Sequence, residues 1–155
     1  MAKEHRYTAK TVWSGATTGY EDYLRAHEVR FPGKPTITAT SDAALGSDRD
    51  HINPEDMLVG ALSSCHMLWY LHLCAVKGVV VTHYEDTAEG IMVEEPGNGR
   101  LTQVTLRPVV KITAESDAAL AKSLHERAHH ECYIANSVNF PVNCKPVIAK
   151  AKAAS

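Results

Sequence analysis

Four cysteines, Cys65, Cys74, Cys132 and Cys144, are the residues of this chain best suited to covalent chemistry. No two of them form a C-x-x-C pair, the spacing of thioredoxin-like redox sites and of many zinc sites. The N-terminal segment has no apolar stretch and no cleavage signal, so we expect a cytoplasmic protein, in which static disulfides are rare. The four thiols are therefore expected to be either buried or chemically active.

Nine histidines offer a second kind of chemistry, the binding of a metal ion. The candidate ligands of a mixed Cys/His site are Cys65, His66, His72, His129, His130 and Cys132. No two of the candidates between 65 and 72 stand at the i, i+4 spacing that an H-x-x-x-H site uses. We therefore expect no metal and no organic cofactor, and a Cys/His metal site is kept as an alternative.

The elements that must position these residues begin with a strand pattern. Residues 5–13, 27–31 and 35–40 have aromatic or β-branched character and are separated by Gly, Pro and Thr, which predicts an N-terminal antiparallel meander. The segment 41–52 is polar and aperiodic, and we predict a loop there.

A helix start follows directly. Asn53 is a favourable N-cap residue, Pro54 suits the first helical position, and Glu55 and Asp56 suit the positive end of the helix dipole. Gly78 is expected to end this helix.

The body of the same helix, residues 57–76, contains no Asp, Glu, Lys or Arg. Its length permits a membrane span. Its serines and histidines make a span costly, and strand patterns flank it on both sides. We therefore predict a central helix that is buried nearly all round, and no membrane association.

Residues 79–94 and 100–113 have strand character and are joined by Pro-Gly-Asn-Gly at 96–99, which predicts an antiparallel hairpin. Residues 140–148 can supply a last strand. This element order predicts an α+β fold in which one antiparallel sheet packs on the long central helix and on a second helix.

The second helix is expected to be capped by Ser116. Along it Leu120, Leu124, Ala128 and Cys132 recur at i+4 spacing. Such a stripe places Cys132 at the inward end of an apolar face.

Length and composition set limits on the function. A chain of 155 residues with 45% apolar and 22% charged residues fits a single globular domain over 1–155. A formal net charge of −2 and a pI near 6.5 provide no basic surface for nucleic acid.

Three motifs carry a resemblance to a known family: N-P-E-D from Asn53, A-L-S-S-C-H from Ala61 to His66, and A-H-H-E-C from Ala128 to Cys132. In this combination the chain resembles the OsmC/Ohr family of thiol peroxidases, and its OsmC-like branch in particular. The resemblance runs from the first strand to about Ile148, and the second cysteine follows the first by 67 residues.

The resemblance implies a fold, an activity and two cysteine roles. It implies an OsmC-like intertwined homodimer that reduces organic hydroperoxides in stress defence. Cys65 would attack the peroxide and become a sulfenic acid, and Cys132 would resolve it as a disulfide. An external dithiol, a lipoyl group among relatives, would then reduce that disulfide.

The family also places an arginine after the first strand, in an R-x-G or R-x-H setting, as the cation of the site. Arg25, in Arg25-Ala26-His27, matches this pattern best, and Arg30 and Arg49 are alternatives. The glutamate of the N-P-E motif is Glu55, the expected carboxylate partner of the arginine.

Helix geometry favours a dimer as well. Glu55 precedes Cys65 by ten residues, which places them about 15 Å apart along one helix. The Glu55 carboxylate that serves one Cys65 is therefore expected from the partner subunit.

The other two cysteines have different expectations. Cys74 lies nine residues beyond Cys65 and therefore on the opposite helix face, which excludes it as the resolving thiol. Cys144 stands in the strand-like tail and is interpreted as structural.

Two residues depart from the family pattern, namely Tyr133 after the second cysteine, where many relatives have proline, and His66 after the first. They keep open a binding or redox-sensing module with little turnover. Apolar residues on the Cys65 face favour an organic peroxide. These residues are Leu58, Leu62, Leu68 and Trp69.

Overall fold

The computed structural model describes residues 1–43 and 46–153 of the chain. It divides into two compact units, Met1–Met57 and Leu58–Ser155. In the predicted loop 41–52, positions 44 and 45 lie outside the described residues. The described part of that loop has no α-helix, and it is tied to the preceding strand by the Thr40 amide, which donates to the Ile52 carbonyl (2.9 Å).

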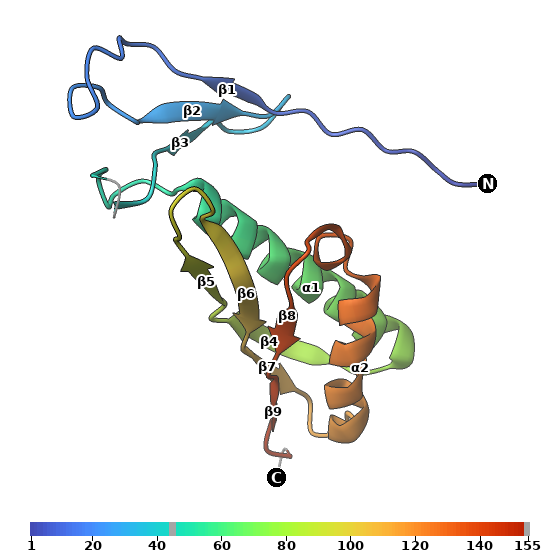
Figure 1. Cartoon of the computed structure of the whole chain (residues 1–155). Coiled ribbons are helices and arrows are strands. Elements are labelled where there is room, and N and C mark those ends of the chain that lie inside the picture. Colours follow the sequence, from blue (N-terminus) through green and yellow to red (C-terminus); the bar gives the residue numbers. More distant parts are fainter. Residues whose placement is uncertain (44–45, 154–155) are drawn as a thin grey trace. The chain divides into compact units, whose positions relative to one another are not determined.

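The first unit is built on a three-stranded antiparallel sheet, drawn in blue in Figure 1. Its strands are β1 (Lys10–Val12), β2 (His27–Arg30) and β3 (Ile37–Ala39), paired in the order β1-β2-β3. The predicted meander is confirmed, with strands shorter than the sequence pattern.

The second unit combines two α-helices with six strands. The long helix α1 (Pro54–Lys77) begins in the first unit and runs through the second. The remaining elements are β4 (Val81–Asp86), β5 (Glu89–Val93), β6 (Arg100–Leu106), β7 (Pro108–Ile112), α2 (Ala118–Glu131), the 3-10 helix η2 (Ala135–Ser137), β8 (Val142–Cys144) and β9 (Val147–Lys150).

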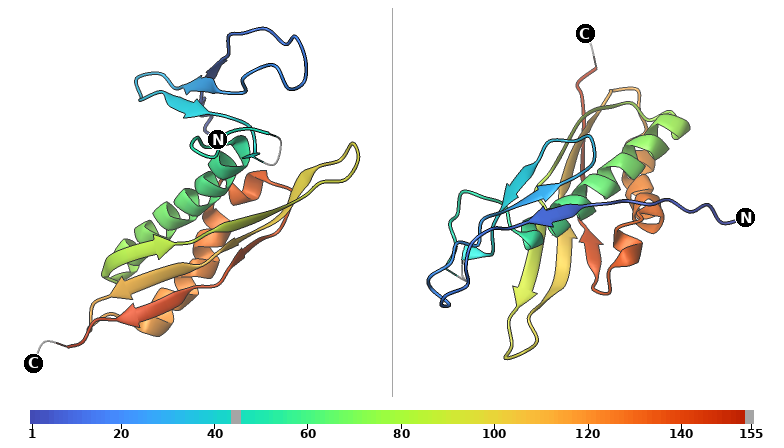
Figure 2. Two further views of the ribbon diagram at one scale, coloured as in Figure 1. Left: turned by 90° about the vertical axis from the view of Figure 1, so that its left-hand side faces the viewer. Right: turned by 90° about the horizontal axis from the view of Figure 1, so that it is seen from above.

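The expected hairpin is present, and each of its arms is interrupted once. β4 pairs with β7 and β5 pairs with β6, all antiparallel, while β9 and β8 add to β7 and β6 in parallel. The second unit therefore has two mixed three-stranded sheets, β4-β7-β9 and β5-β6-β8, rather than one purely antiparallel sheet, because the chain returns through α2 before its last strands. Figures 1 and 2 show α1 and α2 on the same side of these strands, as expected for an α+β fold.

The carboxylate of Asp86 lies where the arms are interrupted. One of its oxygens accepts the backbone N–H of Arg107 (2.6 Å), and the other accepts the Ser63 hydroxyl of α1 (2.5 Å). Pro108, the residue after Arg107, has no backbone N–H to donate to a neighbouring strand. Asp86 therefore links the break in the two arms to the central helix α1 by hydrogen bonds.

The ends of α1 are as predicted. The Asn53 side chain accepts the Asp56 N–H (2.8 Å), and the Asp56 carboxylate accepts the Asn53 N–H (3.1 Å), which together form a capping box. Gly78 follows the last turn with a φ of 74°, a left-handed conformation that glycine adopts without strain.

The prediction that α1 is buried nearly all round is wrong for the single chain. Only one stripe is buried, consisting of Leu62, His66, Tyr70 and Cys74. On the other side Leu68 is 61% and Val76 is 65% exposed. The helix is long and apolar enough to cross a membrane by length and composition, but its buried stripe packs into the core of the second unit, as in the core helix of a folded domain.

The predicted cap of α2 is also wrong. Asp117 caps this helix, because its carboxylate accepts the N–H groups of Ala119 (2.9 Å) and Leu120 (3.0 Å). Ser116 instead accepts the N–H of Val80 (2.9 Å) and joins the start of α2 to the chain after α1.

Candidate active site

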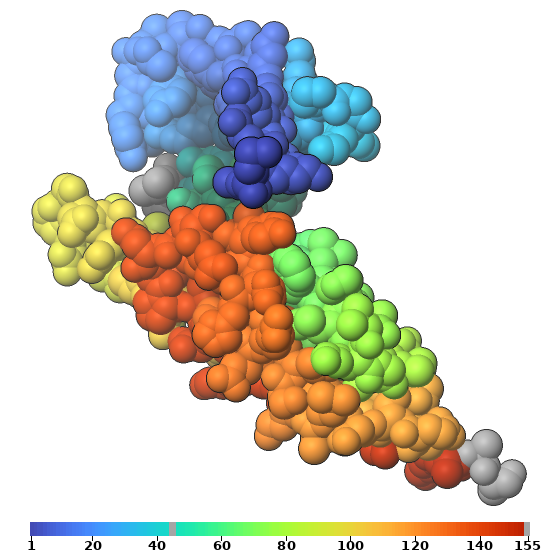
Figure 3. Space-filling view, turned by 90° about the vertical axis from the view of Figure 1, so that its right-hand side faces the viewer, coloured from blue at the N-terminus to red at the C-terminus, as the bar shows by residue number. Residues whose placement is uncertain are grey.

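The helices α1 and α2 lie side by side, as the green and orange segments of Figure 3 show, and each carries one of two neighbouring cysteines. Cys65 is a half-buried residue of α1, on a face next to the buried stripe. Cys132 ends α2 as its C-cap residue and is 1% exposed. Both are free thiols, and Cys65 lies close enough to act on the pKa of Cys132.

The surroundings of Cys132 keep its thiol protonated. Burial is the main cause that raises the pKa of Cys132 to about 11, and the nearby Cys65 thiol raises it further. The Ala135 N–H, 3.5 Å from the sulfur, acts in the opposite direction by stabilising a thiolate.

An apolar hollow continues the Cys65 face along α1. It is lined by Leu68, Trp69 and His72, which stand about one to two turns beyond the thiol. The Trp69 ring meets the ring of Tyr133, the residue after Cys132, edge to face with centroids 5.4 Å apart. Of the apolar residues expected on this face, Leu62 belongs to the core instead.

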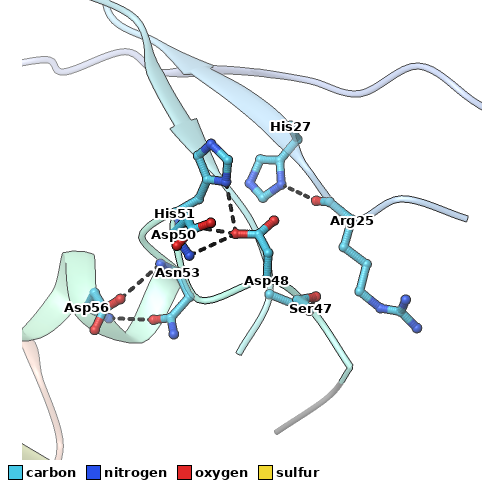
Figure 4. A network of polar contacts seen from close by, with 9 residues as sticks. Arg25, His27, Ser47, Asp48, Asp50, His51, Asn53 and Asp56 are labelled. Carbon is cyan, nitrogen blue, oxygen red and sulfur yellow. Dashed lines mark hydrogen bonds and ion pairs between the residues drawn. The ribbon is translucent and has the colours of Figure 1, made fainter. Parts of the chain in front are cut away.

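Arg25 lies in the first unit, where aromatic rings and carbonyl groups hold its guanidinium. It stands over the rings of Tyr20 (5.0 Å) and Tyr23 (4.5 Å) and donates to the carbonyl oxygen of each, at 3.0 and 3.4 Å. A pocket beside it is lined by Thr11, Trp13, Thr17, Tyr23, Arg25 and His27. The backbone carbonyl of Arg25 is also hydrogen-bonded to the His27 ring (2.9 Å), as Figure 4 shows.

The other predicted polar residues also belong to the first unit. Glu55 is half-buried in the first turn of α1, beside the capping box drawn in Figure 4. Of the alternative arginines, Arg30 is hydrogen-bonded to Glu28 and Arg49 is exposed. The structure thus brings Cys65 close to Cys132. The catalytic roles of Arg25 and Glu55 stay predictions.

A polar cluster that sequence reasoning missed lies behind the thiol pair. His66 Nε2 and His125 Nδ1 are 3.0 Å apart, and the Cys144 sulfur lies 3.6 Å from the former and 3.9 Å from the latter. Burial lowers the pKa of both histidines and raises the pKa of Cys144 to about 12. No local motif joins residues 59 and 78 positions apart, so the sequence held no signal for it.

Cys74 lies where the sequence predicted. It is buried in the core with Tyr70 and Val110, and burial raises its pKa. It takes no part in the contact between Cys65 and Cys132.

The fold and the thiol pair define a class of α+β proteins with two cysteines brought together by two helices. Residues 46–146 match the family model of the OsmC-like proteins, and the chain belongs to this family. None of the curated proteins matches it.

Solved structures agree with this assignment. The chain is 32% identical to an OsmC-like protein of unknown function from Vibrio cholerae, with a TM-score of 0.85, covering 93% of this chain and 100% of the other. It shares its fold with an organic hydroperoxide resistance protein from Elizabethkingia anophelis (18% identity, TM-score 0.73, 97% and 100% covered). Another from Legionella pneumophila has 18% identity and a TM-score of 0.68, with 94% and 97% covered.

Proposed function

We propose that this protein is a thiol peroxidase that reduces organic hydroperoxides with Cys65 and Cys132. The observation that carries the proposal is the contact of a half-exposed thiol with a buried, protonated one. The exposed thiol is accessible to a substrate, and the buried thiol is positioned to react with whatever forms on its neighbour.

The reaction follows from this arrangement. The Cys65 thiolate attacks one peroxide oxygen, the O–O bond breaks, and the alcohol leaves after it gains a proton, so that Cys65 becomes a sulfenic acid. The Cys132 sulfur then attacks the Cys65 sulfur, a disulfide forms and water leaves. An external dithiol reduces the disulfide and is itself oxidised. One hydroperoxide thus yields one alcohol and one water for each dithiol consumed.

A cation is needed in this reaction, because burial alone would disfavour the thiolate. Arg25 is the proposed cation, since arginine stays charged and can hold a carboxylate and a peroxide oxygen at once. Glu55 is the proposed carboxylate, supplied across a homodimer. The aromatic lining around Arg25 suits an organic substrate group in the same way as the hollow beside Trp69.

The proposed setting is a cytoplasmic homodimer without nucleic acid or membrane partners. The chain has no excess of positive charge, at a formal net charge of −2. A small dithiol, lipoyl among relatives, is the proposed reductant. The names of the hydroperoxide resistance proteins that share the fold are consistent with this role.

Peroxide consumption by three proteins tests the proposal. Wild type should consume cumene hydroperoxide in the presence of a dithiol, and Cys65→Ser should consume none. Cys132→Ser should complete one oxidation and leave a sulfenic acid that dimedone traps. Cys74→Ala is the matched control and should behave as wild type. Equal single-turnover losses in Cys65→Ser and Cys132→Ser would contradict the assigned roles.

A further inference from the structure

The cluster of His66, His125 and Cys144 contains buried polar atoms that nothing in the fold satisfies. Among the described residues, four buried side-chain atoms have no hydrogen-bond partner, and all four belong to this cluster or to rings packed against it. They are His66 Nδ1, His125 Nε2, Tyr70 Oη and Tyr84 Oη. Buried polar groups are almost always paired, so these atoms show that the cluster is more polar than its own hydrogen bonds satisfy. The atoms that face one another are the other two ring nitrogens and the Cys144 sulfur.

These rings form one continuous stack in the core. Tyr70 lies flat against His125 with centroids 3.8 Å apart, and Tyr84 lies 5.9 Å from Tyr70. His66 and His125 are 1% and 2% exposed, whereas Cys144 is half-buried. Cys144 is therefore the most exposed of the three residues.

The three inner donor atoms match the edges of a metal coordination tetrahedron. Zinc bonds of about 2.0–2.1 Å to nitrogen and about 2.3 Å to sulfur require N–N edges of about 3.3 Å and N–S edges of about 3.6 Å. The protein has 3.0 Å between the two nitrogens and 3.6 and 3.9 Å from them to the sulfur. The distances between donor atoms need to change by only a few tenths of an ångström, and each ring must turn so that its lone pair points to the ion.

From this geometry we propose that His66, His125 and Cys144 form a binding site for a borderline transition-metal ion of the Zn²⁺ type. Two imidazole nitrogens and one thiolate suit zinc, cobalt and copper better than magnesium or calcium. The three ligands come from α1, α2 and β8, so the ion would join these elements at the centre of the second unit.

Binding exchanges one proton for the metal. In the metal-free protein, a hydrogen bond joins the two inner ring nitrogens, which face each other between nearly coplanar rings (7°). On binding, that proton moves to the outer nitrogen of its ring, both rings turn their lone pairs toward the ion, and Cys144 loses its thiol proton. A fourth position is left for water. The site does not depend on the proposed peroxidase activity, because neither Cys65 nor Cys132 is a ligand.

Titration of the reduced, metal-stripped full chain with Co²⁺ and Zn²⁺ tests the site. We expect one ion per chain, and Co²⁺ should produce a thiolate charge-transfer band and the strong visible bands of a tetrahedral ion. Calorimetry in buffers of different ionisation enthalpy should show release of about one proton per ion. A wild-type chain without these bands overturns the proposal, whatever the variants do.

Variants identify the ligands. Cys144→Ala should remove the charge-transfer band, and Cys144→Ala and His125→Asn should each weaken binding by more than about 100-fold, beyond the loss typical of an outer-shell partner. Cys74→Ala, which removes another buried thiol of α1, and the double variant Cys65→Ser/Cys132→Ser should both bind as wild type. Loss of the band in the double variant, or unchanged binding in Cys144→Ala, assigns the metal elsewhere and overturns the proposal. Zn²⁺ should raise the Tm of wild type and of Cys74→Ala but not of Cys144→Ala.

Discussion

At the scale of single residues, the cysteines differ in accessibility, and burial raises the pKa of three of them, Cys74, Cys132 and Cys144. Cys65 is half-buried, while Cys132 and Cys74 are buried. Burial raises the pKa of Cys132 to about 11 and of Cys144 to about 12 from an ordinary value of 9.0. A thiol is nucleophilic as its thiolate, so these environments assign different chemistry to side chains of one type.

Alkylation kinetics should reflect this difference. At pH 8 a pKa raised from 9.0 to about 11 lowers the thiolate fraction of Cys132 about 100-fold, and burial slows its reaction further. We therefore expect iodoacetamide to modify Cys65 first, as located by mass spectrometry of quenched samples. As pH rises toward 11, the rate for Cys132 should increase. Modification of Cys132 before Cys65 at pH 8 would reverse the proposed roles.

The cation beside Cys65 has a separate test. If Arg25 stabilises the thiolate, Arg25→Ala should slow alkylation of Cys65 near pH 7, because the thiolate fraction falls. Arg30→Ala and Arg49→Ala are the matched controls from the same unit and should leave the rate unchanged. A slower rate in Arg49→Ala with a normal rate in Arg25→Ala would assign the cation to the loop instead.

At the scale of elements, the interrupted hairpin depends on one carboxylate. Asp86 accepts the Arg107 N–H and the Ser63 hydroxyl, so removal of the hydroxyl leaves a partly buried carboxylate short of a donor. We expect Ser63→Ala to lower the free energy of unfolding by about 1–3 kcal/mol, measured by urea denaturation. The neighbouring exposed residue Ser64 offers the control, because Ser64→Ala should change stability by less than about 0.5 kcal/mol. Equal losses in both variants would show that Asp86 does not stabilise this junction.

Sequence patterns predicted those elements whose signals are local. Asn53, Pro54 and Gly78 mark the ends of α1 because caps and left-handed glycines act on the backbone next to them. The prediction of Ser116 as the cap of α2 was wrong by one position, because Asp117 is an equally good cap residue. Ser116 instead accepts the N–H of Val80, which is distant in sequence. A single sequence does not indicate such a distant partner.

The candidate site was predictable to a similar degree. Cys65 and Cys132 were paired through the family motifs, and in the structure Cys65 is near enough to raise the pKa of Cys132, while their catalytic roles stay predictions. The cluster at Cys144 was not foreseen, because its three ligands come from three separate elements. Burial of α1 was overestimated, since apolar composition predicts that a face will be covered but does not say by which chain.

At the scale of the whole molecule, α1 has an apolar side that is exposed to solvent in the single chain. Leu68 is 61% and Val76 is 65% exposed in the single chain, and Tyr133 beyond α2 is 68% exposed. Large apolar side chains grouped on one face are typical of an interaction surface.

We expect a second copy of the chain to cover this face, so sedimentation should detect a dimer, and Leu68→Lys should weaken it. The control is Leu24→Lys, a change at another exposed leucine (82%), which belongs to the first unit. A folded, active monomer would contradict this expectation.

Complementation between subunits tests whether the dimer is also the catalytic unit. Glu55 and Cys65 stand ten residues apart on α1, about 15 Å along the axis, so one helix does not bring both to one centre. If the Glu55 carboxylate acts on the Arg25 beside its partner's Cys65, Glu55→Ala and Cys65→Ser homodimers should each be inactive. When the two variants are unfolded and refolded together, each heterodimer has one site with both residues intact, and the mixture should recover activity.

With equal amounts of the two chains, half of the dimers are mixed and each has one working site of two, so about a quarter of the wild-type rate is expected for random pairing. Each variant refolded alone is the control. No recovery from two inactive, folded and dimeric variants would show that Glu55 serves the Cys65 of its own chain or none.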